Sequence, residues 1–466
     1  MKAAFVGGGS LRLLPIFRGI FHKTPEVFQN GEIRLIDLKR ERAEAVARMT
    51  AACPEYQNVK CKITVTSDLD EALDGIDVLY LTMAAVREPS QTQSFILGKE
   101  YDYIASDQLS IMGAFLSLRL GGFILSLARK LEKSSPDALM LIFPNPVAVY
   151  SCMVNRFTKI RALGICGGFS NHRYDLSRLC FGRDGYDPEW NVVAAGVNHL
   201  SFILRGEYKG EDLYGSLLPR TLTDSWKMMD FSPAGSGNEL LEIAIRSLYR
   251  MYRKYGTMIF STEYDGMAHI VPESTEAEVV RRQIPDICRN FDPEKIRRES
   301  LAEIEKRFAD FIRLSAAPAQ VDWNQKNNAG LPTGRDITDI SIPILKALAG
   351  FEKMRIVASR PNYGVIAGLP ENAACEYTMD ICKDTITPVE NQYIPSPFRG
   401  LIASLSEFQT LNAEALAEHD PKLFAAALDA YPCNRFTKKR KEFFRKMFDI
   451  HTDIDPVWRQ SLDQLM

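Results

Sequence analysis

Short apolar runs alternate with helix-like segments over the first 165 residues of the chain. The apolar runs have the length and composition of buried strands, and they span residues 1–6, 32–38, 63–66, 77–82, 138–143 and 161–166. Segments with helical periodicity or a helix-start signal lie at residues 11–17, 39–52, from 67 onward and at about 113–133. Such alternation predicts a parallel, doubly wound sheet, so we expect an α/β fold with a Rossmann-like N-terminal part.

The pattern changes beyond about residue 190. Residues 192–202 read as one strand that Asn198 and His199 interrupt. Helical stretches follow at residues 237–255, 293–314, 407–418 and 435–448. We therefore expect two domains, a Rossmann-like domain over residues 1–190 and a mixed, helix-rich α/β domain over residues 191–466.

The first strand runs directly into a turn made of Gly7, Gly8, Gly9 and Ser10. A helix follows, and the second strand has Asp37 near its end, which is the order of a dinucleotide site. Such glycines let the backbone approach a pyrophosphate at the positive end of a helix, and the acid accepts hydrogen bonds from a ribose 2′-hydroxyl. Arg12 occupies the third glycine position of the fingerprint, so a purely structural turn is the alternative. Because Asp37 disfavours a 2′-phosphate, the expected cofactor is NAD rather than NADP.

The composition is that of an ordinary soluble protein. The chain has 466 residues, 46% of them hydrophobic and 25% charged, which is enough for two or more domains. A formal net charge of −2 gives no indication of a nucleic-acid or membrane partner. We find no apolar run approaching the ~20 residues of a membrane span, and no signal-peptide pattern. The nine scattered cysteines form no CxxC pair, which favours reduced thiols and a cytoplasmic location.

Polar side chains follow the predicted parallel strands at their carboxyl ends, where ligands of doubly wound folds bind. Asn145 lies between two prolines after one strand, and Cys166 precedes two glycines after the next. His199 follows Asn198 within an apolar segment. Each has a structural alternative, because Asn-Pro is a common turn dipeptide, a free cysteine usually packs as a small hydrophobe, and a lone histidine in a strand is often a satisfied core residue. The functional alternatives are a polar contact near a nicotinamide for Asn145 and a ligand role for Cys166 and His199.

Several short blocks occur in a specific order behind the glycine turn. They are residues 113–119 (Gly-Ala-Phe-Leu-Ser-Leu-Arg), 143–149 (Phe-Pro-Asn-Pro-Val-Ala-Val), 164–167 (Gly-Ile-Cys-Gly), 196–202 (Gly-Val-Asn-His-Leu-Ser-Phe) and 360–370 (Arg-Pro-Asn-Tyr-Gly-Val-Ile-Ala-Gly-Leu-Pro). Together these blocks resemble glycoside hydrolase family 4, the NAD- and manganese-dependent glycosidases. The resemblance runs over most of the chain and is strongest in residues 1–205.

The resemblance implies hydrolysis of an O-glycosidic bond, with 6-phospho-glycosides and uronides among the candidate substrates, by a redox-assisted elimination rather than a carboxylate pair. NAD would oxidise the sugar C3 hydroxyl, a base would remove the acidified C2 proton, and the group on C1 would leave before water adds and C3 is reduced again. By motif position, Cys166 and His199 would hold Mn²⁺ or another divalent metal that polarises the C2 and C3 oxygens. Asn145 and Asn198 would contact sugar or nicotinamide. The family habit also implies a homo-oligomer, a dimer or tetramer, acting on a small carbohydrate.

The chain departs from the family pattern around the site. Gly167 follows the cysteine where Asn, Asp or His is usual, and Gln108 stands where Glu or Asp is expected. The tyrosine base has no clear counterpart, and the best candidate is Tyr264, with Asp265 in reserve. Arg87 stands where some members grip a sugar 6-phosphate, and it could bind a phosphate or carboxylate with two parallel hydrogen bonds. The structural alternatives are a loop tyrosine and a surface arginine.

Two other functions stay open from the sequence. A plain NAD-dependent 2-hydroxyacid dehydrogenase would share the Asn-Pro block and the sheet topology, but Cys166 and residues 360–370 disfavour it. A non-catalytic NAD-binding homologue would explain Gly167 and Gln108.

Overall fold

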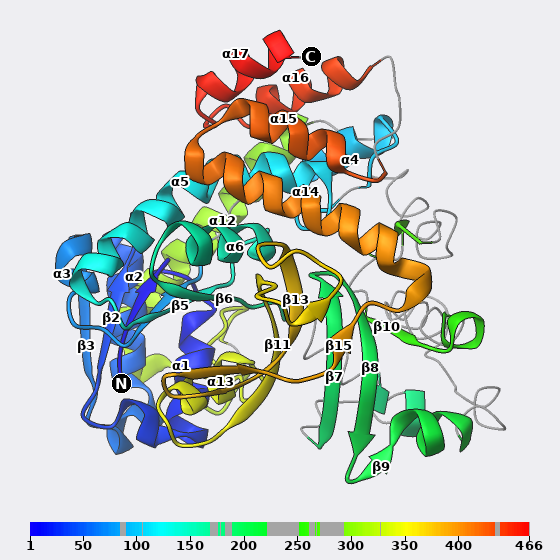
Figure 1. The fold of residues 1–466 in the computed structure, drawn as a ribbon. Helices are drawn as coiled ribbons and strands as arrows, with labels where there is room; N and C mark the ends of the chain where they lie inside the picture. The colour runs from blue at the N-terminus through cyan, green and yellow to red at the C-terminus, as the bar shows by residue number, and fades with distance from the viewer. Residues whose placement is uncertain are drawn as a thin grey trace, which may run out of the picture.

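One mixed β-sheet runs through the protein and joins its two halves (Figure 1). The computed structural model describes residues 1–466 except 84–89, 105, 168–175, 178, 182–188, 221–250, 261–265, 267, 271–292, 327, 434–438 and 466. Within the described residues the sheet has 13 strands, and its main path runs β10-β8-β7-β13-β11-β6-β5-β4-β1-β2-β3.

The N-terminal half of the sheet is parallel. Its strands are β1 (Lys2–Val6), β2 (Glu32–Ile36), β3 (Lys62–Thr66), β4 (Val78–Leu81), β5 (Leu139–Ile142) and β6 (Arg161–Gly164). The order β3-β2-β1-β4-β5-β6 is that of a dinucleotide-binding fold, in register through pairs such as Phe5 with Leu35 and with Tyr80. Every residue of β4 and β5 is buried, as expected for strands covered on both faces. The predicted α/β class is confirmed.

The C-terminal half of the sheet is antiparallel. Its strands are β7 (Trp190–Val197), β8 (Leu200–Tyr208), β9 (Glu211–Asp212), β10 (Met258–Phe260), β11 (Met354–Pro361), β13 (Ala374–Cys382) and β14 (Thr385–Pro388). A separate short pair is formed by β12 (Ile366–Ala367) and β15 (Gln392–Tyr393). Strand β11 joins the two halves because Ser359 pairs with Gly164 of β6. The division into domains at residue 190 stays a prediction.

The described α-helices lie on both sides of the sheet, some directly against it and others beyond that layer. They are α1 (Leu13–Lys23), α2 (Arg40–Ala52), α3 (Leu69–Leu73), α4 (Ser90–Glu100), α5 (Ile111–Ser134), α6 (Val147–Phe157), α12 (Pro293–Ser315), α13 (Ser341–Leu348), α14 (Arg399–Glu418), α15 (Pro421–Ala430), α16 (Arg440–Ile450) and α17 (Pro456–Leu465). Helices α5, α6 and α14 pack against one another above the sheet, and α15, α16 and α17 lie beyond them (Figure 1). Helices α1 and α13 contact each other on the opposite side (Figure 1).

The structure tests the predicted elements of the second half. Helices α12 and α14 confirm the predictions at residues 293–314 and 407–418, although α14 begins earlier, at Arg399. Helix α16 confirms the described part of the prediction at 435–448, of which residues 435–438 lie outside the described residues. The prediction at 237–255 lies largely outside the described residues. The interruption predicted at Asn198 and His199 is confirmed, but the residues on its two sides form two strands rather than one, because β7 and β8 make an antiparallel hairpin in which Val197 pairs with Leu200. The turn between them is made of Asn198 and His199, and His199 adopts a left-handed backbone conformation, φ +71°.

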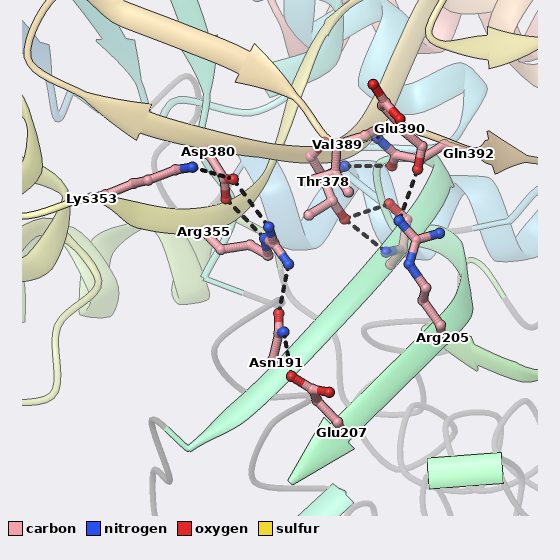
Figure 2. Close-up of polar contacts among 11 residues, drawn as sticks. Asn191, Arg205, Glu207, Lys353, Arg355, Thr378, Asp380, Val389, Glu390 and Gln392 are labelled. Carbon is pink, nitrogen blue, oxygen red and sulfur yellow. Dashed lines mark hydrogen bonds and ion pairs between the residues drawn. The ribbon is translucent and has the colours of Figure 1, made fainter. Parts of the chain in front are cut away.

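Polar side chains hold β7 to its neighbours where the backbone ladder is short (Figure 2). The Thr378 hydroxyl of β13 accepts from the Ala194 N–H at 2.7 Å and donates to the Ala194 carbonyl at 2.9 Å. Further along, Arg355 donates two hydrogen bonds to Asp380, at 2.8 and 3.0 Å, and a third to Asn191 of β7 at 2.9 Å. The Arg355 hydrogen bonds hold the pKa of the Asp380 carboxyl below its usual value. The Thr378 and Arg355 contacts thus extend the connection of β7 to β13 and β11 beyond the two residue pairs of the β7–β13 ladder.

Helix α5 is apolar enough to resemble a membrane span. It has 24 residues, and among the described helices it alone contains an 18-residue window long and apolar enough to cross a membrane. By length and composition, α5 therefore contradicts the expectation that no apolar run approaches the length of a membrane span. However, 72% of that window is buried inside the protein. Its flanking contacts with α6 and α14 are those of a core helix.

Candidate functional site

The glycine turn lies at the carboxyl edge of the parallel strands. Gly7 and Gly8 donate to the Ile36 carbonyl at 2.9 and 2.8 Å, which ties the turn to the end of β2. Gly7 has φ +89°, and a Cβ on it would lie 2.8 Å from the Met83 backbone nitrogen. A Cβ on Gly8 would lie 2.8 Å from the Ile36 nitrogen. Close backbone packing therefore requires glycine at positions 7 and 8, whether or not a ligand binds there.

Asp37 contacts the same turn. Its carboxylate accepts from the Gly9 N–H at 2.9 Å and from the Lys39 N–H at 2.8 Å. Two bonds leave part of the carboxylate's acceptor capacity, which is about four lone-pair sites. Arg12, at the third glycine position, ends the turn as the residue before α1 and forms an ion pair with Asp339 at 2.8 Å. The first turn of α1 has no side-chain cap, and such backbone N–H groups are suited to an anion.

Asn145 takes part in a polar network at the end of β5. Its Nδ2 donates to Asp107 Oδ2 at 2.9 Å, and its Oδ1 accepts from Gln108 Nε2. Gln108 is buried, and its Oε1 accepts from the Val147 N–H at 3.1 Å. Gln91 also donates to Asp107 Oδ2, at 3.3 Å. Gln108 thus orients Asn145, and the carboxylate of this region belongs to Asp107, which the sequence analysis did not select.

Cys166 and His199 are brought together as predicted. Cys166 follows β6, His199 lies in the β7–β8 turn, and Cys166 Sγ is 3.6 Å from His199 Nε2. One transition-metal ion could be bound by both atoms, because their separation is shorter than the sum of a metal–sulfur bond of about 2.3 Å and a metal–nitrogen bond of about 2.1 Å. Thiolate and imidazole also suit a borderline transition metal. The pair therefore fits a metal, and without one it makes a thiol–imidazole hydrogen bond.

Among the described residues, no third acid, cysteine or histidine joins this pair as a further ligand. Over the part of the chain that the structure describes, no group of three or more of these residues is arranged to hold a metal ion. Gly167, next to Cys166, faces open space with respect to the described residues, because a Cβ on it would have none of their heavy atoms within 4 Å.

Asn198 is held by Glu376, a buried residue that the sequence analysis did not select. Its Nδ2 donates to Glu376 Oε2 at 2.7 Å, and Ser201 Oγ donates to Glu376 Oε1 at 2.9 Å. Asn198 Oδ1 is buried and has no hydrogen-bond partner within the described chain. The signal for Glu376 was available, since it is a carboxylate within the otherwise apolar start of β13.

Three candidate residues lie outside the described residues. They are Arg87, Tyr264 and Asp265. Strand β10 ends just before the segment of Tyr264, and its last residue, Phe260, pairs with Ser201 of β8. The roles of these three residues stay predictions.

Two family models match most of the chain, and relatives of known activity resemble it over nearly its whole length. The family model described as family 4 glycosyl hydrolase matches residues 2–179, and the model described as family 4 glycosyl hydrolase C-terminal domain matches residues 194–432. The chain is 23% identical over 452 residues to an alpha-galactosidase of Bacillus subtilis, covering 94% of this chain and 95% of that protein. It is 21% identical over 465 residues to an alpha-galacturonidase of Thermoanaerobacter italicus, covering 96% of each.

Solved structures share the fold. The 6-phospho-beta-glucosidase of Thermotoga maritima, crystallised with manganese, NAD⁺ and glucose-6-phosphate, has a TM-score of 0.72 at 14% identity, over 97% of this chain and 99% of that one. A 6-phospho-alpha-glucosidase from gut microorganisms, in complex with NAD and Mn²⁺, has a TM-score of 0.74 at 20% identity, over 98% and 99%. The two family models together match both halves of the sheet and the turns that carry Cys166 and His199, and the chain therefore belongs to glycoside hydrolase family 4.

Proposed function

We propose that the protein hydrolyses a glycosidic bond with the help of NAD and a divalent metal, by oxidation at C3, proton removal at C2 and elimination at C1. The observation that carries the proposal is the 3.6 Å separation of Cys166 Sγ and His199 Nε2 at the edge of the sheet that also holds the glycine turn. Relatives of this chain named as galactosidase, galacturonidase and 6-phospho-glucosidase support the glycosidase activity. Structural neighbours crystallised with NAD and Mn²⁺ support the cofactors.

The glycine turn and Asp37 would hold NAD. The Gly9 N–H is taken by Asp37, so the uncapped start of α1 would offer the backbone N–H groups that bind a pyrophosphate. Asp37, fixed by its bonds to Gly9 and Lys39, would accept the ribose hydroxyls with its remaining lone pairs. When bound, NAD would supply reversible oxidation of the C3 hydroxyl, and a metal on Cys166 and His199 would polarise the C2 and C3 oxygens.

The chain's own residues would orient the sugar and move its protons. Asn145 and Asn198 would contact the sugar or the nicotinamide. Tyr264 would remove the C2 proton, because a nearby cation lowers the pKa of a phenol, and Asp265 is the alternative base. Loss of that proton lets the electron pair on C2 expel the group on C1, and water later adds to C1 and returns a proton to C2. Arg87 would bind a phosphate or carboxylate of the substrate.

The division of the chain at residue 190, a cytoplasmic location and a homo-oligomeric state are part of the same proposal. The buried cysteines of the described residues are free thiols, which supports a reducing compartment. Burial raises the pKa of the Cys152 and Cys375 thiols to about 12, so neither is a reactive thiolate.

Hydrolysis of nitrophenyl glycosides, with and without a 6-phosphate, tests this function. We expect turnover to require both NAD and Mn²⁺, and hydrolysis in D₂O to place deuterium at C2 of the product. Hydrolysis without label at C2 would show that the elimination mechanism is wrong. Bulk reduction of NAD by malate or lactate, without glycoside hydrolysis, would support a dehydrogenase instead.

A further inference from the structure

Glu376 is a buried carboxylate between the two segments that carry Cys166 and His199. It lies on β13, opposite Gly196 of β7, and only 8% of its surface is exposed. The neighbouring strand β11 pairs with Gly164, two residues before Cys166, through Ser359. The Ser359 hydroxyl also donates to Glu376 Oε2, at 3.5 Å. One carboxylate therefore touches the strand beside the cysteine and the hairpin of the histidine.

The hydrogen bonds of Glu376 fix the histidine turn from both sides. Asn198, the residue before His199, donates to Oε2 at 2.7 Å, and Ser201, two residues after it, donates to Oε1 at 2.9 Å. A carboxylate only accepts, so it requires the Asn198 side chain to present its NH₂ group. Asn198 Oδ1 is consequently fixed as an acceptor, and it has no partner within the described chain.

The charge of Glu376 has no counter-ion in the described part of the chain. Asn198, Ser201 and Ser359 are neutral donors. In the described residues no lysine, arginine or histidine forms an ion pair with Glu376, whereas Asp380 on the same strand has Arg355 and Lys353. Buried carboxylates are normally paired with a cation or a metal. A divalent cation held by Cys166 and His199 would supply the missing positive charge.

We propose that Glu376 is a positioning residue of the metal site, holding the Asn198–His199 turn and offsetting the charge of the ion from a second layer. The proposal rests on the metal role of Cys166 and His199 proposed above. Outer-layer partners of metal ligands typically change metal affinity by about 10- to 100-fold when they are replaced. Glu376 would act before any substrate binds.

Titration of the metal-free protein with Mn²⁺ alone, followed by calorimetry, tests the proposal. We expect Glu376→Gln to weaken Mn²⁺ binding by at least about tenfold, with NAD affinity unchanged. Glu376→Asp keeps the charge but shortens the side chain, and its affinity should lie between those of the wild type and Glu376→Gln. The matched control is Asp380→Asn, which removes a carboxylate from the same strand and should bind Mn²⁺ like the wild type even if it melts earlier.

The outcomes separate this inference from the proposed function. If the wild type binds Mn²⁺, Cys166→Ser abolishes binding and folded Glu376→Gln binds normally, the role of Glu376 is overturned while the metal site stands. If the wild type binds no Mn²⁺, both proposals fail. If Glu376→Gln does not fold, Ser201→Ala provides the test: it removes one hydrogen bond to Glu376, and unchanged Mn²⁺ affinity in that variant overturns the inference.

Discussion

Cys166 Sγ and His199 Nε2 lie 3.6 Å apart although 33 residues separate them in the sequence. The two residues come from different halves of the sheet. Cys166 follows the last parallel strand, β6, and His199 turns the antiparallel hairpin of β7 and β8. Strands β11 and β13 lie between β6 and β7, so the join of the two halves is what brings the ligands together.

We expect Cys166→Ser to abolish Mn²⁺ binding and Mn²⁺-dependent turnover, because serine replaces a thiolate by a hydroxyl that stays protonated. NAD affinity should not change, since the glycine turn lies after β1. Metal analysis and calorimetry measure both. Cys382→Ser, a half-buried cysteine at the end of β13, is the control and should keep its metal. Equal metal content in Cys166→Ser and the wild type would contradict the site.

Asp37→Ala should weaken NAD binding by at least about tenfold, the cost of losing a hydrogen bond to a charged group. NADP binding should fall much less, because its 2′-phosphate does not need this acceptor. The carboxylate also holds the Gly9 and Lys39 N–H groups, so the thermal stability of the variant should fall as well. Calorimetric titration with each cofactor separates the two effects. A loss of affinity shared by NAD and NADP reports the weakened turn, and a difference between the two losses reports the contact of Asp37 with the ribose hydroxyls. An equal loss for both cofactors would show that Asp37 does not contact the ribose.

Gly167→Asn should fold like the wild type, because the position faces open space. A substitution there should change the free energy of unfolding by no more than about 0.5 kcal/mol. Gly164→Ala is the matched contrast, since its Cβ would lie 2.7 Å from the Val147 carbonyl oxygen, and we expect a loss of about 1–3 kcal/mol. Urea unfolding of both variants measures this difference. If Gly167→Asn is as unstable as Gly164→Ala, the absence of a side chain after Cys166 has a structural cause.

The histidine at the end of α16 should make the protein sensitive to mild acid. His451 Nε2 lies 2.7 Å from Ser94 Oγ of α4, and burial, reinforced by Arg119, lowers the pKa of His451 to about 4. An unfolded histidine has a pKa of about 6.5. The unfolded chain therefore takes up the proton first, so the stability that the neutral ring provides is full above pH ~6.5 and is lost as the pH falls toward ~4, by at most about 3 kcal/mol.

Urea unfolding of His451→Gln at pH 7.5 and pH 5 checks this sign. The variant should lose less stability than the wild type between the two values, because glutamine does not take up a proton. His22→Gln, at an exposed position, is the control and should follow the wild type. Parallel losses in all three proteins would show that His451 does not carry the pH dependence.

The N-terminal half of the fold could be predicted because its signals are local. Strand β1, the glycine turn, α1 and β2 with Asp37 follow one another in about 37 residues, and each is set by periodicity or by glycine geometry. The hairpin of β7 and β8 was missed because its turn contains no glycine. His199 takes the left-handed conformation there, which a sequence pattern does not indicate for histidine.

The site could be predicted only where its residues carry their own motif. Cys166 and His199 belong to blocks with a recognisable order, so their meeting could be anticipated. Glu376 acts through contacts with Asn198 and Ser201, about 175 residues away, and no local pattern records such a pairing. The same holds for Asp107, whose role depends on the orientation of Asn145.

The hydrogen bonds of Asn145 lead to a double-mutant prediction. Asn145 donates to Asp107 and accepts from Gln108, so its amide has one orientation. In Gln108→Glu the donor is lost, and Asn145 Oδ1 would face a carboxylate. The amide cannot satisfy both sides by turning over, because its oxygen would then face Asp107. We expect Gln108→Glu alone to lose about 1–3 kcal/mol of stability, the cost of an unsatisfied buried group, and to bind NAD more weakly if Asn145 contacts the nicotinamide.

The exchange Asp107→Asn with Gln108→Glu should restore much of that loss. Asn145 can then turn over, accept from residue 107 and donate to residue 108, while the new carboxylate at 108 still accepts from the Val147 N–H. Urea unfolding of the wild type, both single variants and the double variant gives the coupling energy, which we expect to be favourable and about 1–2 kcal/mol. The rescue should be incomplete, because the Gln91 amide also donates to Asp107. In Asp107→Asn, Gln91 can still donate to the asparagine oxygen, which competes with the orientation in which residue 107 donates to Asn145. If the effects of the two substitutions on the free energy of unfolding are additive, residues 107 and 108 do not together orient the Asn145 amide. The position of the carboxylate, at 107 or at 108, would then not affect that amide.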